Sequence, residues 1–156
     1  MTINIGENLS INDYWTSGYT CITIYSGSAA SGTGYLNSIT LNVHAAISGL
    51  KVGTFYQTSG SNYTNRDYTT IGSATVGAHT YTGLNIAVTS GDFIGHYNTA
   101  GSLNSHLATG AEVSSAADGF VTPLTNYMDH GGTCPVLYGS SAAAAAVSVG
   151  LFTFHG

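Results

Sequence analysis

Apolar and polar residues alternate along most of this 156-residue chain with the period of two that is typical of a β-strand. In the clearest case Ile39, Leu41, Val43 and Ala45 share one face, and polar residues lie between them. Residues 1–12 alternate in the same way, so they are predicted to form an extended N-terminal arm with one apolar face. The apolar positions of the arm are Ile3, Ile5, Leu9 and Ile11.

Further strands are separated by turn signals rich in Gly, Ser, Asn and Asp. They are predicted at residues 20–26, 38–45, 50–58, 68–76, 79–88, 93–98, 103–109 and 143–154. Residues 110–135 show no clear period and are predicted to be a long functional or interface loop. This series of short strands, with no convincing helix, predicts one all-β domain over residues 1–156. Its expected architecture is an antiparallel two-sheet β-sandwich of jelly-roll type.

The closing segment combines a helix signal with a strand signal. The five alanines at 142–146 favour a helix, but they run directly into VSVGLFTF. Gly150 and the β-branched and aromatic residues of that sequence favour a strand. Val149 and Leu151 make one face apolar, and Phe152 and Phe154 make the other face apolar. Such a strand is central in its sheet or buried against another subunit.

Fixed positive charge is limited to Lys51 and Arg66, against seven acidic residues, so the formal net charge is −5. Binding to nucleic acid requires clustered basic residues that displace counterions from phosphates, and two cations form no such cluster. The same argument excludes attraction to an anionic membrane surface. No apolar stretch reaches the length of a membrane span, and no signal peptide is visible. The low charge also gives weak repulsion between copies, which proteins that pack against themselves tolerate.

Three stretches resemble a jelly-roll module of uncharacterised phage and environmental proteins. They are VGTFYQTSGSNYTNRD at 52–67, YTGLNIAV at 81–88 and SGDFIGHY at 90–97. The resemblance covers roughly residues 35–98 and the closing strand, and it consists of strand and turn motifs. It implies a jelly-roll fold in a virion or cell-surface setting, and it implies no catalytic residues.

Motifs for catalysis are absent from the sequence. There is no G-x-S-x-G nucleophile elbow and no phosphate-binding loop. Glycoside hydrolysis uses a pair of carboxylates, and Asp92 is better explained as a residue that caps a turn. The chain is therefore predicted not to be an enzyme.

Metal binding has a partial signal and no complete motif. Asp129, His130 and Cys134 resemble part of a transition-metal site, for which His106 or Asp118 would be a further ligand. No spacing requires such a site, so we predict no metal and no cofactor. Calcium bound by loop carbonyls stays open as an alternative without a motif.

Sugar binding is the alternative that the aromatic residues suggest, because a pyranose presents an apolar face and a polar rim. Asn12 and Asp13 are accompanied by Tyr14, Trp15 and Tyr19. Asn65 and Asp67 are flanked by Tyr63 and Tyr68. Tyr and Thr are also frequent in ordinary strands, which explains the same pattern without a ligand.

Arg66 lies in Asn65-Arg66-Asp67, which is predicted to be a loop. It either binds a carboxylate of a neighbouring chain or forms an ion pair with Asp67 or another acid of its own chain. Cys21 and Cys134 form a disulfide or are two buried thiols, and the sequence leaves both open.

The sequence as a whole predicts a structural, self-assembling subunit of a virion surface, a tail-associated assembly or an extracellular filament. Its partner would be itself, as a homo-oligomer or polymer, with no nucleic acid and no membrane insertion. The expected interface residues are Ile3, Ile5, Leu9, Ile11, Arg66, Phe152 and Phe154. The alternative is a carbohydrate-binding module or adhesin head with glycans as ligands.

Overall fold

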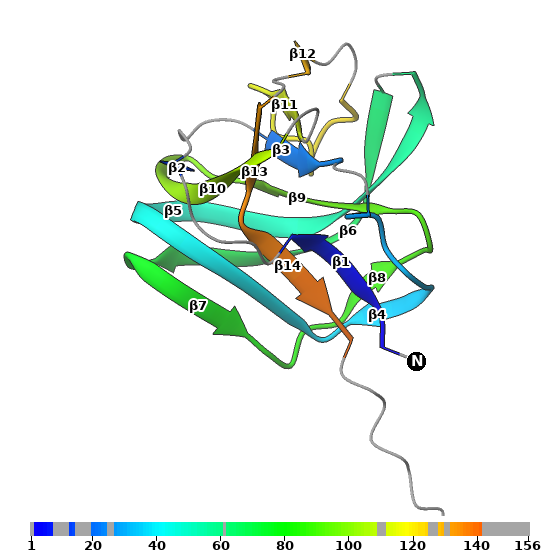
Figure 1. The fold of residues 1–156 in the computed structure, drawn as a ribbon, viewed down its shortest axis with the longest axis horizontal. Coiled ribbons are helices and arrows are strands. Elements are labelled where there is room, and N and C mark those ends of the chain that lie inside the picture. Colours follow the sequence, from blue (N-terminus) through cyan, green and yellow to red (C-terminus); the bar gives the residue numbers. More distant parts are fainter. Residues whose placement is uncertain are drawn as a thin grey trace, which may run out of the picture.

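The computed structural model describes residues 2–7, 13–14, 20–24, 27–60, 62–108, 112–124, 128–129 and 132–141. Within these residues the chain is all-β, with no helix and with antiparallel strand pairs (Figure 1). The strands are β1 (Asn4–Glu7), β2 (Asp13–Tyr14), β3 (Thr20–Thr23), β4 (Gly34–Leu36), β5 (Ser38–Ser59), β6 (Asn62–Ala74), β7 (Gly77–Tyr81), β8 (Ile86–Val88), β9 (Phe93–Tyr97), β10 (Ala100–Ala108), β11 (Glu112–Ser115), β12 (Met128–Asp129), β13 (Gly132–Pro135) and β14 (Leu137–Ser140). The described residues contain no helix that is long and apolar enough to cross a membrane.

The 22-residue strand β5 organises the fold. Along one edge it pairs first with β7 and then with β6, and along the other edge with β14, β10 and β9 in turn. Two separate strands were predicted here, at 38–45 and 50–58. They are one strand because Gly49 has a φ of +63° and lies at an irregularity of the β5–β6 ladder, so the chain bends without leaving the sheet.

The hydrogen-bonded ladders form one twelve-stranded sheet and a separate two-stranded sheet of β4 and β8. The all-β, antiparallel prediction is confirmed. The two-sheet arrangement of jelly-roll type stays a prediction, because β5 belongs to both halves of the large sheet and joins them into one.

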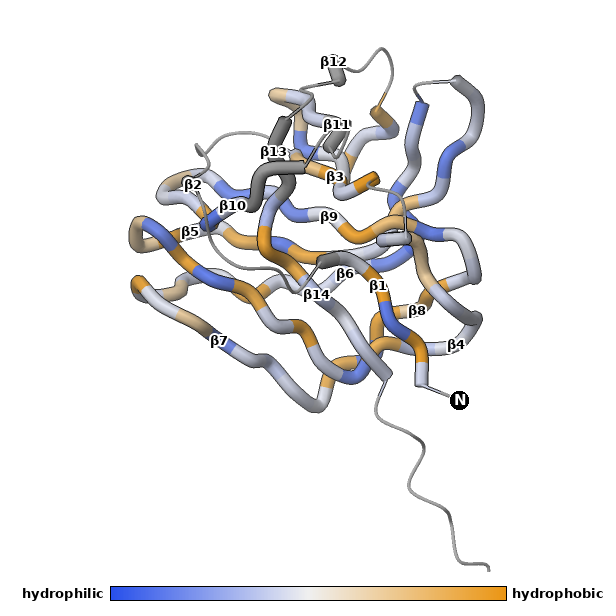
Figure 2. Tube along the Cα trace, in the orientation of Figure 1, coloured by the Kyte–Doolittle hydropathy of each residue, from blue (hydrophilic) through white to orange (hydrophobic). Residues whose placement is uncertain are grey.

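Hydrophobic residues alternate with polar ones along β5, and the apolar positions contribute to the main core (Figure 2). This core contains Ile39 and Leu41 from the first half of β5, and Val52 from its second half. Ile5 of β1 and Ile94 of β9 are buried in the same core. Side chains from both halves of the bent sheet therefore meet in one interior.

A second, smaller core lies on the opposite face of the β5–β9–β3 part of the sheet. It contains Ile22, Phe55, Tyr63, Phe120 and Leu124. Phe120 and Leu124 come from the segment 116–124, which follows β11 and joins β6 through a bridge between Tyr63 and Leu124. This segment covers a sheet face that would otherwise expose aromatic side chains.

Several predicted elements differ in the structure. The arm at 1–12 contains β1, which pairs with β14, and Ile3 and Ile5 are buried in the chain's own core. Their side chains pack inside the domain, and their role at a subunit interface stays a prediction. The predicted loop 110–135 contains β11, β12 and β13. Leu9, Ile11, Phe152 and Phe154 lie outside the described residues, as does the predicted strand 143–154.

Candidate functional site

An ion pair joins the second half of β5 to the segment 116–124. The Lys51 Nζ donates a hydrogen bond to Oδ2 of Asp118 at 2.6 Å, and each side chain is 22% exposed. This hydrogen bond raises the pKa of Lys51 above its ordinary value. Oδ1 of Asp118 accepts the backbone N–H of Phe120 at 3.0 Å. One carboxylate therefore both binds the strand and fixes the turn that positions Phe120.

Phe120 lies between two aromatic rings on the sheet. Its ring centroid is 4.9 Å from that of Phe55 and 5.2 Å from that of Tyr68. The sheet makes room for these rings with the paired glycines Gly53 and Gly95. A Cβ at Gly95 would lie 2.8 Å from the Phe55 ring, and one at Gly53 would lie 2.6 Å from Cβ of Tyr68.

A shallow groove of about 200 Å³ lies where β6 meets this segment. It is lined by Thr64, Asn65 and residues 119–123. Tyr68, which contacts Phe120, is 41% exposed, and Val121 is 71% exposed. Hydroxyl groups, an aromatic ring and an amide in one groove suit a neutral polar ligand with an apolar face.

A second ion pair joins β6 to the turn before β9. The Arg66 guanidinium donates from Nε to Oδ2 of Asp92 at 2.5 Å and from Nη2 to Oδ1 at 3.0 Å. Asp92 is buried and also accepts the backbone N–H of Thr89. The Arg66 Cζ lies 4.7 Å from the Tyr56 ring centroid. The hydrogen bond to Asp92 raises the pKa of Arg66.

The position of Arg66 differs from the predicted loop. Thr54 pairs with Asp67 and Phe55 pairs with Asn65, so Arg66 is the extra residue of a β-bulge inside β6. A bulge redirects the side chain that it carries, and here it directs the guanidinium to Asp92. Of the two expectations for Arg66, the ion pair with an acid of its own chain is the one that the structure shows.

Asp67 completes the set of charged side chains that the structure describes. Its Oδ1 accepts the N–H of Tyr68, and its Oδ2 accepts the N–H of Ala87 at 2.8 Å. In the described part of the chain, both cations are paired and all three described carboxylates are hydrogen-bonded. These charged groups therefore make their contacts within the chain.

His96 is a fully buried polar residue that the sequence reasoning did not identify. It lies on β9, opposite Val52 of β5 and Cys21 of β3. Neither ring nitrogen has a hydrogen-bond partner within the part of the chain that the structure describes. Burial lowers the pKa of His96 to about 4, so its imidazole is neutral at physiological pH.

The fold separates Tyr63 from Tyr68, the two tyrosines predicted to bind sugar beside Asn65 and Asp67. Tyr63 is buried at 5% exposure in the second core, so it offers no face to a sugar, whereas Tyr68 is exposed beside the groove. Tyr14 lies in β2, which pairs with β10. Trp15 and Tyr19 lie outside the described residues.

The cysteine and metal predictions fall in part outside the described side chains. Cys21 is completely buried in β3, and Cys134 lies in β13, opposite His106 of β10. The disulfide stays a prediction. Among the described side chains, no group of three or more His, Cys, Asp or Glu is placed to hold a metal ion.

The chain was compared with protein-family models, with curated proteins and with solved structures, and none of them matches it.

Proposed function

We propose that this chain is a structural, non-enzymatic subunit that assembles with copies of itself, in a virion surface, a tail-associated assembly or an extracellular filament. The supporting observation is that the described charged side chains bind partners within the same chain. Lys51 binds Asp118 and Arg66 binds Asp92, while Asp67 is capped by two backbone N–H groups. The proposal includes a jelly-roll type of fold and a virion or extracellular location.

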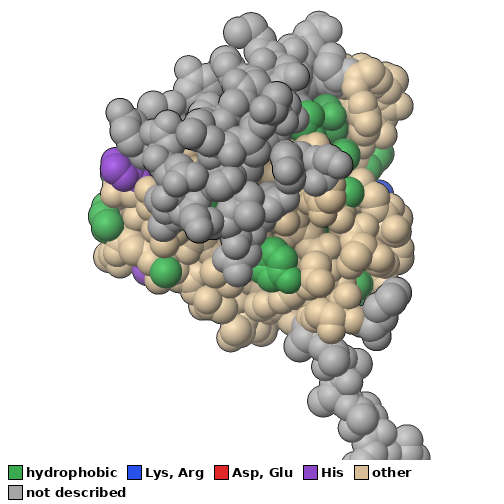
Figure 3. Space-filling view, viewed as in Figure 1, with side chains coloured by type: hydrophobic (Ala, Val, Ile, Leu, Met, Phe, Trp, Pro, Cys, Tyr) green, Lys and Arg blue, Asp and Glu red, His purple; other side chains and the backbone are tan. Residues whose placement is uncertain are grey.

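Internal pairing of charge matters because ionic repulsion is what usually keeps soluble proteins apart. The described surface in Figure 3 is mostly neutral backbone and polar side chain, with scattered hydrophobic groups and His, and Lys or Arg visible only at one margin. Contacts between copies of such a surface would rely on backbone pairing, hydroxyl groups and aromatic rings. Tyr is enriched at protein interfaces, and the chain has eleven.

Mass photometry and negative-stain electron microscopy of the purified chain test this proposal directly. We expect oligomers or filaments whose fraction rises with protein concentration. A monodisperse monomer at all concentrations between pH 5 and pH 8 contradicts it. Measurements in low and high salt give a second readout, because assembly through neutral contacts is expected to change little with ionic strength.

A second candidate function is glycan binding in the groove beside Tyr68. The observation that favours it is the exposed Tyr68 ring, which contacts Phe120, a residue that lines this groove together with Thr64 and Asn65. A glycan array with the original chain and Tyr68→Ala tests it, with Tyr35→Ala as a control for loss of an exposed tyrosine elsewhere. Binding that is lost only in Tyr68→Ala supports the groove, and absence of binding to any glycan contradicts it.

A further inference from the structure

One long edge of the sheet is open in the described structure. β6 and β7 follow each other along the same side of β5. The start of β6 is covered by the bridge to Leu124 and by the bond from Ala87 to Asp67. From Tyr68 to Tyr81, no described strand pairs with the outer side of this edge. Figure 1 shows β7 at the outer margin of the molecule.

The sequence of this edge lacks the charged residues and proline that protect many edge strands against pairing. Residues 68–81 read YTTIGSATVGAHTY, with no Lys, Arg, Asp, Glu or Pro. Natural edge strands commonly carry charges or proline, because their unpaired N–H and C=O groups attract other strands. Val76 is 66% exposed, and Ala78 and Thr80 are exposed as well. The edge therefore combines strand-forming residues with free access.

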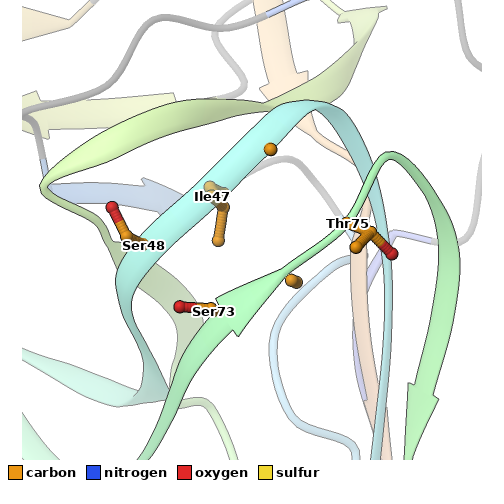
Figure 4. A pocket seen from close by; sticks show the side chains of 6 residues that line it. Ile47, Ser48, Ser73 and Thr75 are labelled. Atoms are coloured by element: carbon orange, nitrogen blue, oxygen red, sulfur yellow. The ribbon is translucent and has the colours of Figure 1, made fainter.

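The main core is incompletely covered at the same edge. Ile71 and Tyr81 pack against it but are only partly buried. Between β5 and the end of β6 lies an open pocket of about 400 Å³, lined by Ala46, Ile47, Ser48, Ser73, Ala74 and Thr75. Figure 4 shows Ile47 and Ser48 on β5 at one wall, with Ser73 and Thr75 at the other. A further strand along this edge would cover the half-buried residues and the pocket together.

We propose that the strand covering this edge is residues 142–156 of a neighbouring copy. The inference rests on the self-assembly proposed above and identifies its contact. The segment provides fifteen residues, or about 50 Å of extended chain, for an edge of fourteen residues. Val147, Val149 and Leu151 make one of its faces apolar, and Phe152 and Phe154 lie on the other, which suits a strand with core on one side and a neighbouring molecule on the other.

The point at which the segment leaves the described structure favours exchange between copies. Ser140 pairs with Ser38, and the next residue of β5, Ile39, pairs with Tyr81 at the end of β7. Within one chain, Asn37 lies between Ser140 and the residues that follow β7, because its N–H donates to the carbonyl of Ser140 and its own carbonyl accepts the N–H of Leu84. The segment would have to pass around this connection to reach the outer side of β7. We therefore assign the segment to the edge of another molecule. Such a head-to-tail contact builds rings or filaments.

The register that we propose sets apolar residues of the segment opposite the partly buried residues of β7. Residues directly opposite each other in an antiparallel pair share a face. If Val147 lies opposite Tyr81, then Val149 lies opposite His79 and Leu151 opposite Gly77. The same register brings Phe152 and Phe154 to the level of residues 74–76, where the pocket lies. Thr80, which is exposed, then faces Ser148.

Cysteine cross-linking tests the neighbour relationship in the full chain. One sample carries Thr80→Cys and another carries Ser148→Cys, and the two are mixed and oxidised mildly. We expect a covalent dimer of one chain of each kind, at least tenfold more abundant than with the original chain or with the matched pair Ser90→Cys and Ser148→Cys, where Ser90 is exposed and lies outside the edge and the groove. No dimer above that background overturns the inference.

Charge substitutions test the register and separate the two proposals. Thr80→Lys and Ser148→Glu are each expected to raise the protein concentration at half assembly at least tenfold, whereas Ser90→Lys leaves it unchanged. The double variant is expected to recover most of the loss, because the new opposite charges face each other across the interface. If the chain assembles but neither single substitution matters, this edge is not the interface and the self-assembly proposal stands. If the original chain stays monomeric, both fail.

Discussion

Lys51 and Asp118 are 67 positions apart in the sequence, and the Lys51 Nζ lies 2.6 Å from Oδ2 of Asp118. The contact matters because Asp118 begins the turn that places Phe120 over Phe55. Each of the two cations in the chain holds a connecting segment to the sheet through an ion pair. Lys51 holds the segment 116–124 to the sheet, and Arg66 holds the turn around Asp92.

Asp118→Ala is expected to lower the free energy of unfolding by about 1 kcal/mol, because it removes a partly exposed ion pair and the hydrogen bond to the N–H of Phe120. Urea denaturation measures the change. Asp118→Asn keeps an acceptor for Phe120 but removes the charge, so it is expected to cost less. Equal losses in both variants contradict a role for the backbone hydrogen bond.

Arg66→Lys is expected to destabilise the fold by about 2 kcal/mol, although it keeps the positive charge. A lysine makes one contact where the guanidinium makes two, and Asp92 is buried, so an incompletely paired carboxylate is costly there. The free energy of unfolding of Arg66→Lys, compared with that of Lys51→Arg, provides the test. A loss below a few tenths of a kcal/mol shows that the second hydrogen bond contributes nothing.

The alternating pattern predicted most of β5 and β9 and parts of β3, β6, β7, β8 and β10, because burial of one sheet face leaves a period of two in the sequence. It did not predict where a strand ends. Ser48-Gly49 resembles a turn, but Gly49 forms a bend within β5, and only tertiary pairing with β6 and β10 keeps the two halves in one strand. Whether a glycine bends or breaks a strand depends on partners that are distant in sequence.

The candidate site was harder to predict, because its contacts are long-range. Arg66 lies near Asp67 in sequence, yet it pairs with Asp92, since the bulge directs it away from its neighbour. Tyr63 and Tyr68 flank the same motif, but one is buried and the other exposed. His96 has polar and apolar neighbours in sequence that give no sign of complete burial. Sequence pattern locates the face of a residue, and the segment that covers that face is set by the fold.

Gly53→Ala is expected to destabilise the fold by about 3 kcal/mol, because the new Cβ would lie 2.2 Å from the backbone oxygen of Asp67. That oxygen accepts the Asn65 side chain at 3.0 Å, so a shift of the backbone would disturb the bulge as well. Gly60→Ala is the control. Its φ of +50° costs about 1 kcal/mol, but no atom lies within 4 Å of the added Cβ. Thermal or urea unfolding ranks the two, and a smaller loss at Gly53 than at Gly60 contradicts the crowding argument.

Stability is expected to fall as the pH decreases from about 6.5 to about 4, because of His96. The pKa of its buried imidazole is about 4 in the folded chain, below the ordinary value near 6.5. Between these values the unfolded chain binds a proton that the folded chain excludes, so the stabilisation is complete above pH 6.5 and is lost on acidification. The expected loss from this residue alone is about 3 kcal/mol.

His96→Leu isolates this effect from the carboxylates, which also titrate in acid. The substitution replaces a buried ring without hydrogen-bond partners in the described residues by an apolar side chain, so it is expected to cost little at pH 7.5 or to stabilise. Its free energy of unfolding, measured in urea at half-unit steps between pH 7.5 and pH 4, is expected to vary less with pH than that of the original chain. The difference between the two curves should grow by about 3 kcal/mol over that range. Parallel curves contradict a neutral buried His96, because a group that does not change its proton affinity on folding adds no pH dependence.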